Sequence, residues 1–292
     1  MPTLHAVALA CDFHPRFLNF FPTASYFWQK NFGLLPHLGV VYEPHQSALA
    51  KRFKAQFSNF GNIILLEAHP EATLGNQAKL ARWFIASRVA SPWTTIDDLD
   101  TIHVHSRYLT GKFKEVPEGK LLAIGQEVYE GHRHEGAFPM GNFSGSSENF
   151  KSLFDLQDDE VKFPDFVERF RGRKEYRTNP FFPIDEFSDE ELLRDIRSEK
   201  LFDVNLHFAK RDLDINVSWL DRSRWISNRR IMKRKDFFES VNFPRPFYLK
   251  RGMIYTALRA IDKNTLTLEI PIPKYDFAWN LENFLKKKWS PR

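Results

Sequence analysis

The chain has 292 residues, which suits one large or two small domains and allows a substantial core. Hydrophobic residues at 42% and charged residues at 27% are ordinary for a soluble globular protein. The formal charge of +5 weakly favours an anionic partner, whether a nucleotide, a nucleic acid or a membrane surface.

Three features of the sequence indicate the cellular compartment. The single cysteine, Cys11, cannot form an internal disulfide, so the sequence carries no sign of an oxidising environment. No apolar run approaches the roughly 20 residues that span a bilayer. The first residues lack the basic start and long apolar core of a signal peptide. We therefore expect a cytoplasmic protein.

The first hundred residues alternate between predicted strands and helices. Each strand is a short, largely apolar run of the kind found in buried parallel sheets. The first helix has apolar residues at helical spacing, and Gly33 is expected to end it. Ser47 is a possible N-cap of the second helix. This order predicts an α/β fold with a mostly parallel central sheet covered by helices on both faces. The ranges are strands at 6–10, 37–42 and 62–67, helices at 17–32, 47–57 and 76–89, and a fourth strand through Asp98.

Residues 93–104 begin as an apolar, β-branched run and then reach three carboxylates, Asp97, Asp98 and Asp100. On a strand, Asp98 and Asp100 would lie on one face. Adjacent carboxylates repel unless a cation or a proton lies between them, and Mg²⁺ or Mn²⁺ shared with substrate phosphates meets that need. The alternative is a solvated acidic turn, since Asp212-Leu213-Asp214 repeats the same spacing.

Position in the predicted sheet favours the first copy. Asp12 and the Asp98–Asp100 pair both follow predicted strands, and ligands of such sheets bind beyond the carboxyl ends of the strands. Asp212 lies outside the alternating unit. The sequence has no Gly-x-Gly-x-x-Gly or Walker-type loop, which argues against a typical dinucleotide-binding or P-loop enzyme.

After residue 104 the alternation weakens. His132 and His134 lie in a predicted loop, as candidate metal or sugar ligands or simply as polar loop residues. Asp185 and Glu186 lie among phenylalanines, just before a predicted helix, and fit either a general base or the acidic start of that helix. The expected elements are a helix at 106–113, a strand at 121–125, a loop at 131–147, and helices at 148–156, 158–179 and 190–198.

Several stretches, taken in order, resemble the nucleotide-sugar glycosyltransferases of the GT-A fold. The resemblance spans roughly residues 5 to 260, and the ordered set carries it rather than any one motif. It implies a single GT-A-like domain over 1–292, with a nucleotide-sugar half at 1–104 and an acceptor half with a C-terminal extension at 105–292. The stretches are Asp12 with Phe20-Phe21-Pro22 and Trp28-Gln29-Lys30-Asn31-Phe32-Gly33, Asn76-Gln77-Ala78-Lys79-Leu80-Ala81-Arg82, Asp98-Leu99-Asp100, Ser147 to Phe154, Asp185-Glu186, and Leu220-Asp221-Arg222-Ser223-Arg224-Trp225.

The resemblance also implies roles. Asp98 and Asp100 would hold Mn²⁺ or Mg²⁺ on the diphosphate of a UDP- or GDP-sugar, where the ion neutralises the leaving group. Asp185 or Glu186 would deprotonate the hydroxyl of a glycan or other acceptor in an inverting displacement. The other donor-binding residues would be Ala10, Cys11, Asp12, Gln77, Lys79 and Arg82. The acceptor-side residues would be His132, His134, Asp221, Arg222 and Trp225.

The sequence departs from the GT-A enzymes at one metal ligand. Similar enzymes often supply a further ligand, commonly a histidine, from the C-terminal half. The corresponding stretch here reads Asn242-Phe243-Pro244-Arg245-Pro246. His207 and the His132–His134 pair are the candidates for that ligand.

Two other hypotheses stand beside sugar transfer. A Mg²⁺-dependent nucleotidyltransferase would usually carry a Gly-rich basic loop where this chain reads Cys11-Asp12-Phe13-His14-Pro15. A non-catalytic protein with a GT-A-like fold would bind a nucleotide or sugar without transferring it. We expect no nucleic-acid partner, because that needs a concentrated basic face. We expect at most a peripheral membrane contact, through Lys286-Lys287-Lys288-Trp289.

Overall fold

A seven-stranded sheet lies at the centre of the computed structural model, which describes residues 3–125, 130–131, 143–171, 206–210, 219–220, 240–242 and 258. Its strand order is β3-β2-β1-β4-β7-β6-β8. Only β7 runs against its neighbours, so the predicted mostly parallel sheet is confirmed. The strands are β1 (Ala6–Asp12), β2 (His37–Tyr42), β3 (Asn62–Glu67), β4 (Thr94–Ile96), β6 (Leu121–Ile124), β7 (Phe143–Gly145) and β8 (Leu206–Ala209).

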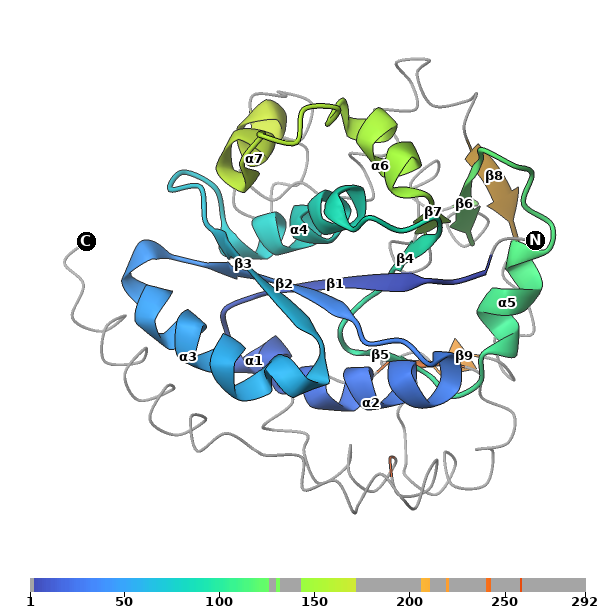
Figure 1. Cartoon of the computed structure of the whole chain (residues 1–292), viewed down its shortest axis with the longest axis horizontal. Coiled ribbons are helices and arrows are strands. Elements are labelled where there is room, and N and C mark those ends of the chain that lie inside the picture. The colour runs from blue at the N-terminus through green and yellow to red at the C-terminus, as the bar shows by residue number, and fades with distance from the viewer. Residues whose placement is uncertain are drawn as a thin grey trace.

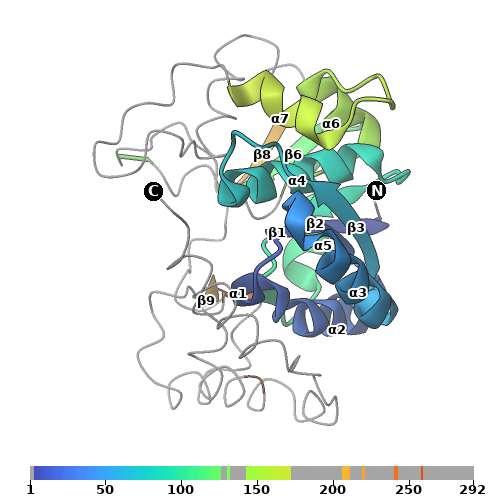
Figure 2. The same ribbon diagram turned by 90° about the vertical axis from the view of Figure 1, so that its left-hand side faces the viewer.

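Helices cover both faces of this sheet, as predicted (Figures 1 and 2). On one face lie α1 (Pro15–Leu18), α2 (Phe21–Phe32) and α3 (Ser47–Phe57), and on the other lie α4 (Leu74–Arg88), α6 (Ser147–Phe154) and α7 (Phe163–Arg171). A further helix is α5 (Arg107–Phe113), and short 3₁₀ turns lie at Pro44–Gln46 and Ser58–Phe60. Within the described ranges no helix combines the length and apolarity needed to cross a bilayer.

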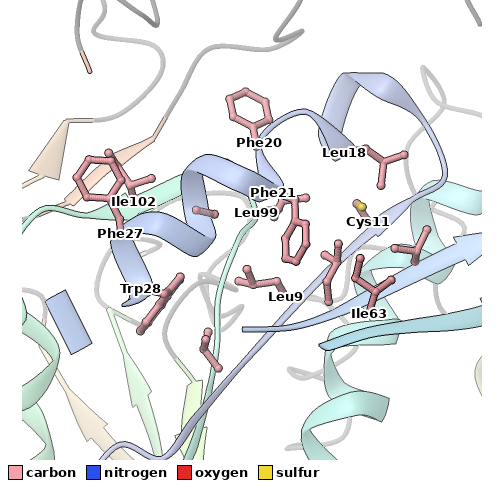
Figure 3. Packing of buried hydrophobic residues seen from close by; sticks show 14 of the residues in the cluster. Leu9, Cys11, Leu18, Phe20, Phe21, Phe27, Trp28, Ile63, Leu99 and Ile102 are labelled. Carbon is pink, nitrogen blue, oxygen red and sulfur yellow. The ribbon is translucent and has the colours of Figure 1, made fainter. Parts of the chain in front are cut away.

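The residues of β1 explain why the two faces differ. Val7, Leu9 and Cys11 alternate with alanines, and period two sends the larger side chains to one face and the alanines to the other. Leu9 and Cys11 pack in an apolar cluster with the aromatic helix α2 (Figure 3). Ala6 and Ala8 belong to the cluster under α4. Small residues on that face let α4 lie close to the sheet.

The predicted first helix is divided in two. The chain forms α1 and then α2, with Asn19 and Phe20 in a turn between them. The predicted stop at Gly33 is confirmed, because Gly33 adopts a left-handed φ of 71° and its N–H donates to the carbonyl of Gln29 at 2.9 Å. Glycine takes this conformation with little steric cost.

Gly39 marks the closest approach of α4 to the sheet. A Cβ placed there would overlap Cδ1 of Ile85 on α4 and lie 3.4 Å from Cδ1 of Leu66. We therefore expect Gly39→Val to lower the free energy of unfolding by about 1–3 kcal/mol through overpacking. Urea denaturation measures this. A variant as stable as the original would mean that Ile85 moves aside freely. Gly75→Val, where a Cβ meets nothing within 4 Å, isolates the effect of crowding from that of removing a glycine.

A second, smaller sheet follows the acidic stretch. It has the order β5-β10-β9, from Thr101–His103, Ser240–Asn242 and Trp219–Leu220. β5 pairs antiparallel with β10, and β9 pairs parallel with it. The chain therefore leaves the central sheet at Ile96 and enters the small sheet at Thr101.

The prediction that Asp98 and Asp100 lie on one face of a strand is wrong. β4 ends at Ile96, and residues 97–100 form the connection to the small sheet. The N–H of Thr101 donates to the carbonyl of Asp98 at 3.0 Å, and the N–H of Asp98 donates to Oδ1 of Asp97 at 2.8 Å. Aspartate makes such local hydrogen bonds readily, and they compete with strand pairing.

Two further predictions of secondary structure are wrong. The expected loop at 131–147 contains β7, which lies between β4 and β6. The expected helix at 158–179 begins only at Phe163, because the carboxylate of Asp158 accepts from the N–H of Glu160 in a preceding turn. Residues 172–179 and the predicted helix at 190–198 lie outside the described residues.

Candidate functional site

The strand order reverses between β1 and β4. From β1 the chain moves outward through β2 to β3, with α1, α2 and α3 on one face. It then returns through α4, on the opposite face, to place β4 on the other side of β1. In sheets of this kind, ligands bind outside the carboxyl ends of the strands where the order reverses. Asp12 ends β1 and the acidic turn at 97–100 follows β4, so both lie at this point.

Arg82 and Asp98 form the charged contact of this edge. Nη1 of Arg82 lies 2.5 Å from Oδ1 of Asp98. The Arg82 side chain is 7% exposed, whereas that of Asp98 is 29% exposed. A nearly buried guanidinium needs an anionic partner, and Asp98 supplies it while staying within reach of solvent. Two predicted donor-binding residues, 16 positions apart in the chain, are therefore in direct contact.

Asp97 is a third acidic residue of the turn, for which the sequence suggested no role. Its Oδ2 lies 2.8 Å from Nε2 of His103, and its Oδ1 accepts from the N–H of Asp98. Both side chains of the pair are buried. Burial raises the pKa of the Asp97 carboxyl, and the neighbouring His103 partly offsets that rise. A carboxylate six residues before a histidine is the signal in the sequence, but it is a weak one.

The donor set of the turn suits a hard divalent cation. Asp98 and Asp100 offer carboxylate oxygens, the ligands that Mg²⁺ and Mn²⁺ prefer. Asp100 is buried, with 1% of its surface exposed. In the part of the chain that the structure describes, no three His, Cys, Asp or Glu side chains come together to hold an ion. Two carboxylates can hold such an ion when its remaining ligands come from water or substrate phosphates, which is how proteins usually bind Mg²⁺.

Gln77 and Lys79 lie on the first turns of α4. Gln77 is fully buried and engages the backbone of the loop after β3, since its Nε2 donates to the carbonyls of His69 and Ala72, each at 2.9 Å. Its Oε1 accepts from the N–H of His69 at 2.7 Å. In this structure the Gln77 side chain therefore fixes the loop after β3. Lys79 is half-buried, one helical turn before Arg82.

Ala10, Cys11 and Asp12 form the end of β1. Ala10 packs against the cluster under α4, whereas Cys11 is buried in the cluster on the other face. Burial raises the pKa of the Cys11 thiol well above its usual value, with a further contribution from Asp12. The Cys11 side chain therefore belongs to the core. Asp12 is partly exposed at the strand end.

The acceptor side of the prediction falls on residues that the structure does not describe. His207, a candidate metal ligand, lies on β8, three strands from β4 in the sheet. At about 4.8 Å between neighbouring strands, this places the two strands roughly 14 Å apart. The other residues, all outside the described ranges, are His132, His134, Asp185, Glu186, Asp221, Arg222, Trp225 and the second acidic copy at 212–214.

An open cavity of about 400 Å³ lies at the opposite edge of the sheet. It is lined by the amino ends of β1, β2 and β3, including His37 and Asn62, and by the end of α4 at Arg88. The Arg88 guanidinium is already engaged by Asp159 and by the carbonyl of Asp158. Burial lowers the pKa of His37, which favours its neutral form. The cavity is thus separate from the acidic turn.

No protein-family model matches the chain, and neither does any curated protein. Among solved structures, the galactosyltransferase LgtC in complex with donor and acceptor sugar analogues is 12% identical, with 87% of this chain and 95% of that chain covered and a TM-score of 0.47. Mouse xyloside xylosyltransferase 1 is 13% identical (77% and 89% covered, TM-score 0.36). The 4-diphosphocytidyl-2C-methyl-D-erythritol synthase of Anaerococcus prevotii is 7% identical (71% and 90% covered, TM-score 0.36). Each likeness is partial.

Proposed function

We propose that this chain is a GT-A-like glycosyltransferase that moves a sugar from a nucleotide-diphosphate sugar to an acceptor hydroxyl. The observation that carries the proposal is the acidic turn at the reversal of strand order, with Asp98 held by Arg82. A partly exposed carboxylate beside a guanidinium, at the carboxyl edge of a parallel sheet, suits an anionic ligand that arrives with a divalent cation. The proposed domain is 1–292, with the donor half at 1–104.

Each residue of the donor side has a proposed part. Asp98 and Asp100 would hold Mn²⁺ or Mg²⁺, which as a Lewis acid would neutralise the departing nucleoside diphosphate. Arg82 would keep Asp98 in place, and Lys79, one turn earlier on α4, would contact the diphosphate. The end of β1 at Ala10, Cys11 and Asp12 would border the base and ribose of a UDP- or GDP-sugar, and Gln77 would hold the neighbouring loop.

The acceptor side of the proposal rests on the sequence. Asp185 or Glu186 would remove the proton from the acceptor hydroxyl as the sugar transfers with inversion. His132, His134, Asp221, Arg222 and Trp225 would bind the glycan or other acceptor. These residues come from the 105–292 half.

A Mg²⁺-dependent nucleotidyltransferase is the alternative enzyme. Such an enzyme cradles a triphosphate with a long, Gly-rich, basic loop after its first strand. Here β1 ends at Asp12 and α1 begins at Pro15, so only Phe13 and His14 lie between them. That connection contains neither glycine nor a lysine or arginine. This observation favours sugar transfer.

Isothermal calorimetry with UDP and with GDP, each with and without MnCl₂, tests the proposal first. We expect one nucleotide to bind more tightly when Mn²⁺ is present, because its phosphates complete the coordination of the ion. Release of sugar from UDP- or GDP-sugars would then separate an enzyme from a non-catalytic binding protein. Absence of nucleotide binding under all four conditions would reject the proposal.

Lys79→Ala should weaken binding of the selected nucleoside diphosphate by at least about tenfold. A hydrogen bond to a charged group contributes on the order of 1.5–3 kcal/mol, which corresponds to that factor or more. Calorimetry in MnCl₂ measures the affinity. Lys54→Ala removes an exposed lysine from α3, on the opposite face of the sheet, and should leave the affinity unchanged. Equal affinities for the two variants would assign Lys79 to an ordinary solvated helix face.

A further inference from the structure

A buried aspartate–histidine pair links the two sheets across the acidic turn. Asp97 follows β4 of the central sheet, and His103 ends β5 of the small sheet. Oδ2 of Asp97 lies 2.8 Å from Nε2 of His103, and the two side chains are 2% and 1% exposed. Burying a polar group is costly unless it is hydrogen-bonded, and each member of this pair supplies a partner for the other. The pair therefore fixes the separation of β4 and β5 at the two ends of the turn.

The backbone N–H and the second carboxylate oxygen of Asp97 fix the position of Asp98. Its backbone N–H donates to the carbonyl of Ala8 at 3.1 Å, which extends the pairing of β4 with β1 by one residue. Its Oδ1 accepts from the N–H of Asp98 at 2.8 Å. The peptide plane before Asp98 cannot turn without breaking this bond. Asp97 thus ties the backbone of Asp98 to both sheets.

The aromatic helix α2 holds the histidine from the other side. The rings of Trp28 and Phe32 lie edge-on to the imidazole, with ring centroids 5.1 and 6.0 Å away. Nδ2 of Asn31 donates to the carbonyls of His103 and Val104, at 2.6 and 3.0 Å. Packing therefore confines the imidazole, so that Nε2 points at the Asp97 carboxylate. Residues Trp28 to Phe32 thus have a structural role, which is to hold His103 in place.

We propose that Asp97 and His103 are positioning residues that hold the turn so that the carboxylate of Asp98 faces the donor diphosphate, an inference that rests on the proposed function. Neither residue acts on the donor itself. His103 donates a hydrogen bond from Nε2 to the Asp97 carboxylate, Asp97 holds the Asp98 amide, and Arg82 holds the Asp98 side chain. The direction of the Asp98 carboxylate is thereby set from both its backbone and its oxygen.

Two variants of His103 separate hydrogen bonding from packing. His103→Phe keeps a ring between Trp28 and Phe32 but removes the N–H donor, whereas His103→Gln keeps an N–H donor and loses the ring. Hydrogen–deuterium exchange of residues 97–101 reads out the turn directly. Calorimetry with UDP and with GDP, with and without MnCl₂, reads out the consequence for binding. We expect at least about tenfold faster exchange and about tenfold less Mn²⁺-dependent tightening in His103→Phe, and near-original values in His103→Gln.

Thr95→Val is the matched control. Thr95 lies on β4, two residues before Asp97, and its Oγ1 accepts a hydrogen bond from Ser144 at 2.8 Å inside the core. Its loss should lower the melting temperature without speeding exchange at 97–101. If His103→Phe does not fold, Asp97→Ala carries the same test, because it removes both of the side-chain oxygens that contact His103 and the Asp98 amide. Two results would overturn the proposal. One is exchange at 97–101 that stays at the original rate in His103→Phe, or in the Asp97 variant where His103→Phe does not fold. The other is a turn that loosens as much in His103→Gln as in His103→Phe.

Hydrogen–deuterium exchange at 97–101 and nucleotide binding test the two proposals separately. A turn that loosens in His103→Phe but not in His103→Gln shows that the pair holds the turn. If the original protein then binds no nucleotide, the proposed function is rejected, and with it the orientation of Asp98 toward a donor, while the hold on the turn stands. A protein that binds Mn²⁺ and nucleotide together, with a turn indifferent to both His103 variants, would keep the function and reject the positioning role.

Discussion

Asp98→Asn and Asp100→Asn are each expected to abolish the Mn²⁺-dependent tightening of nucleoside diphosphate binding and to lower sugar transfer by at least about 100-fold. A cation at a developing negative charge supplies several kcal/mol of transition-state stabilisation, and each 1.36 kcal/mol is tenfold in rate. Asparagine keeps the size of the side chain and an oxygen that can face Arg82, so the loss would report the charge. Calorimetry and a transfer assay measure the two effects.

Asp159→Asn is the control for this pair. Asp159 is also a carboxylate held by an arginine, Arg88, but it is 72% exposed and contacts the end of α4 away from the acidic turn. Binding and transfer should be unchanged in this variant. Asp212→Asn tests the second acidic copy, which lies outside the described residues. If Asp212→Asn loses the tightening and Asp98→Asn does not, the metal site belongs to the second copy.

The first three strands of the central sheet and the first long helix follow from local patterns. β1, β2 and β3 are largely apolar runs, and α2 carries apolar residues at helical spacing. β7 cannot be predicted from a local pattern of this kind. Its three residues, Phe143, Ser144 and Gly145, include only one apolar side chain, and the strand is held by backbone pairing with β4 and β6.

The sequence located the acidic turn but not its geometry. Strand periodicity places Asp98 and Asp100 together and sends Asp97 to the other side, so it suggests no role for Asp97. In the structure Asp97 contacts His103 from a second sheet and accepts from the Asp98 amide. Pairings such as Arg82 with Asp98 and Asp97 with His103 depend on how α4 and α2 pack against the sheets. No local pattern in the sequence encodes those distances.

Asp185→Asn is expected to lower sugar transfer by about 10²–10⁴-fold while leaving donor and Mn²⁺ binding intact, because general-base catalysis supplies a factor of that order. The base must come from a segment other than the acidic turn, whose carboxylates would already be engaged with Arg82, His103 and the cation. Asp185 and Glu186 are adjacent, and neighbouring side chains of an extended segment point apart, so only one should act. Glu186→Gln, the matched control, should therefore lose much less. Transfer rate, donor affinity and the anomeric configuration of the product are measured for both variants. Normal transfer by Asp185→Asn would place the base elsewhere, and a product that retains the donor's configuration would reject inversion itself.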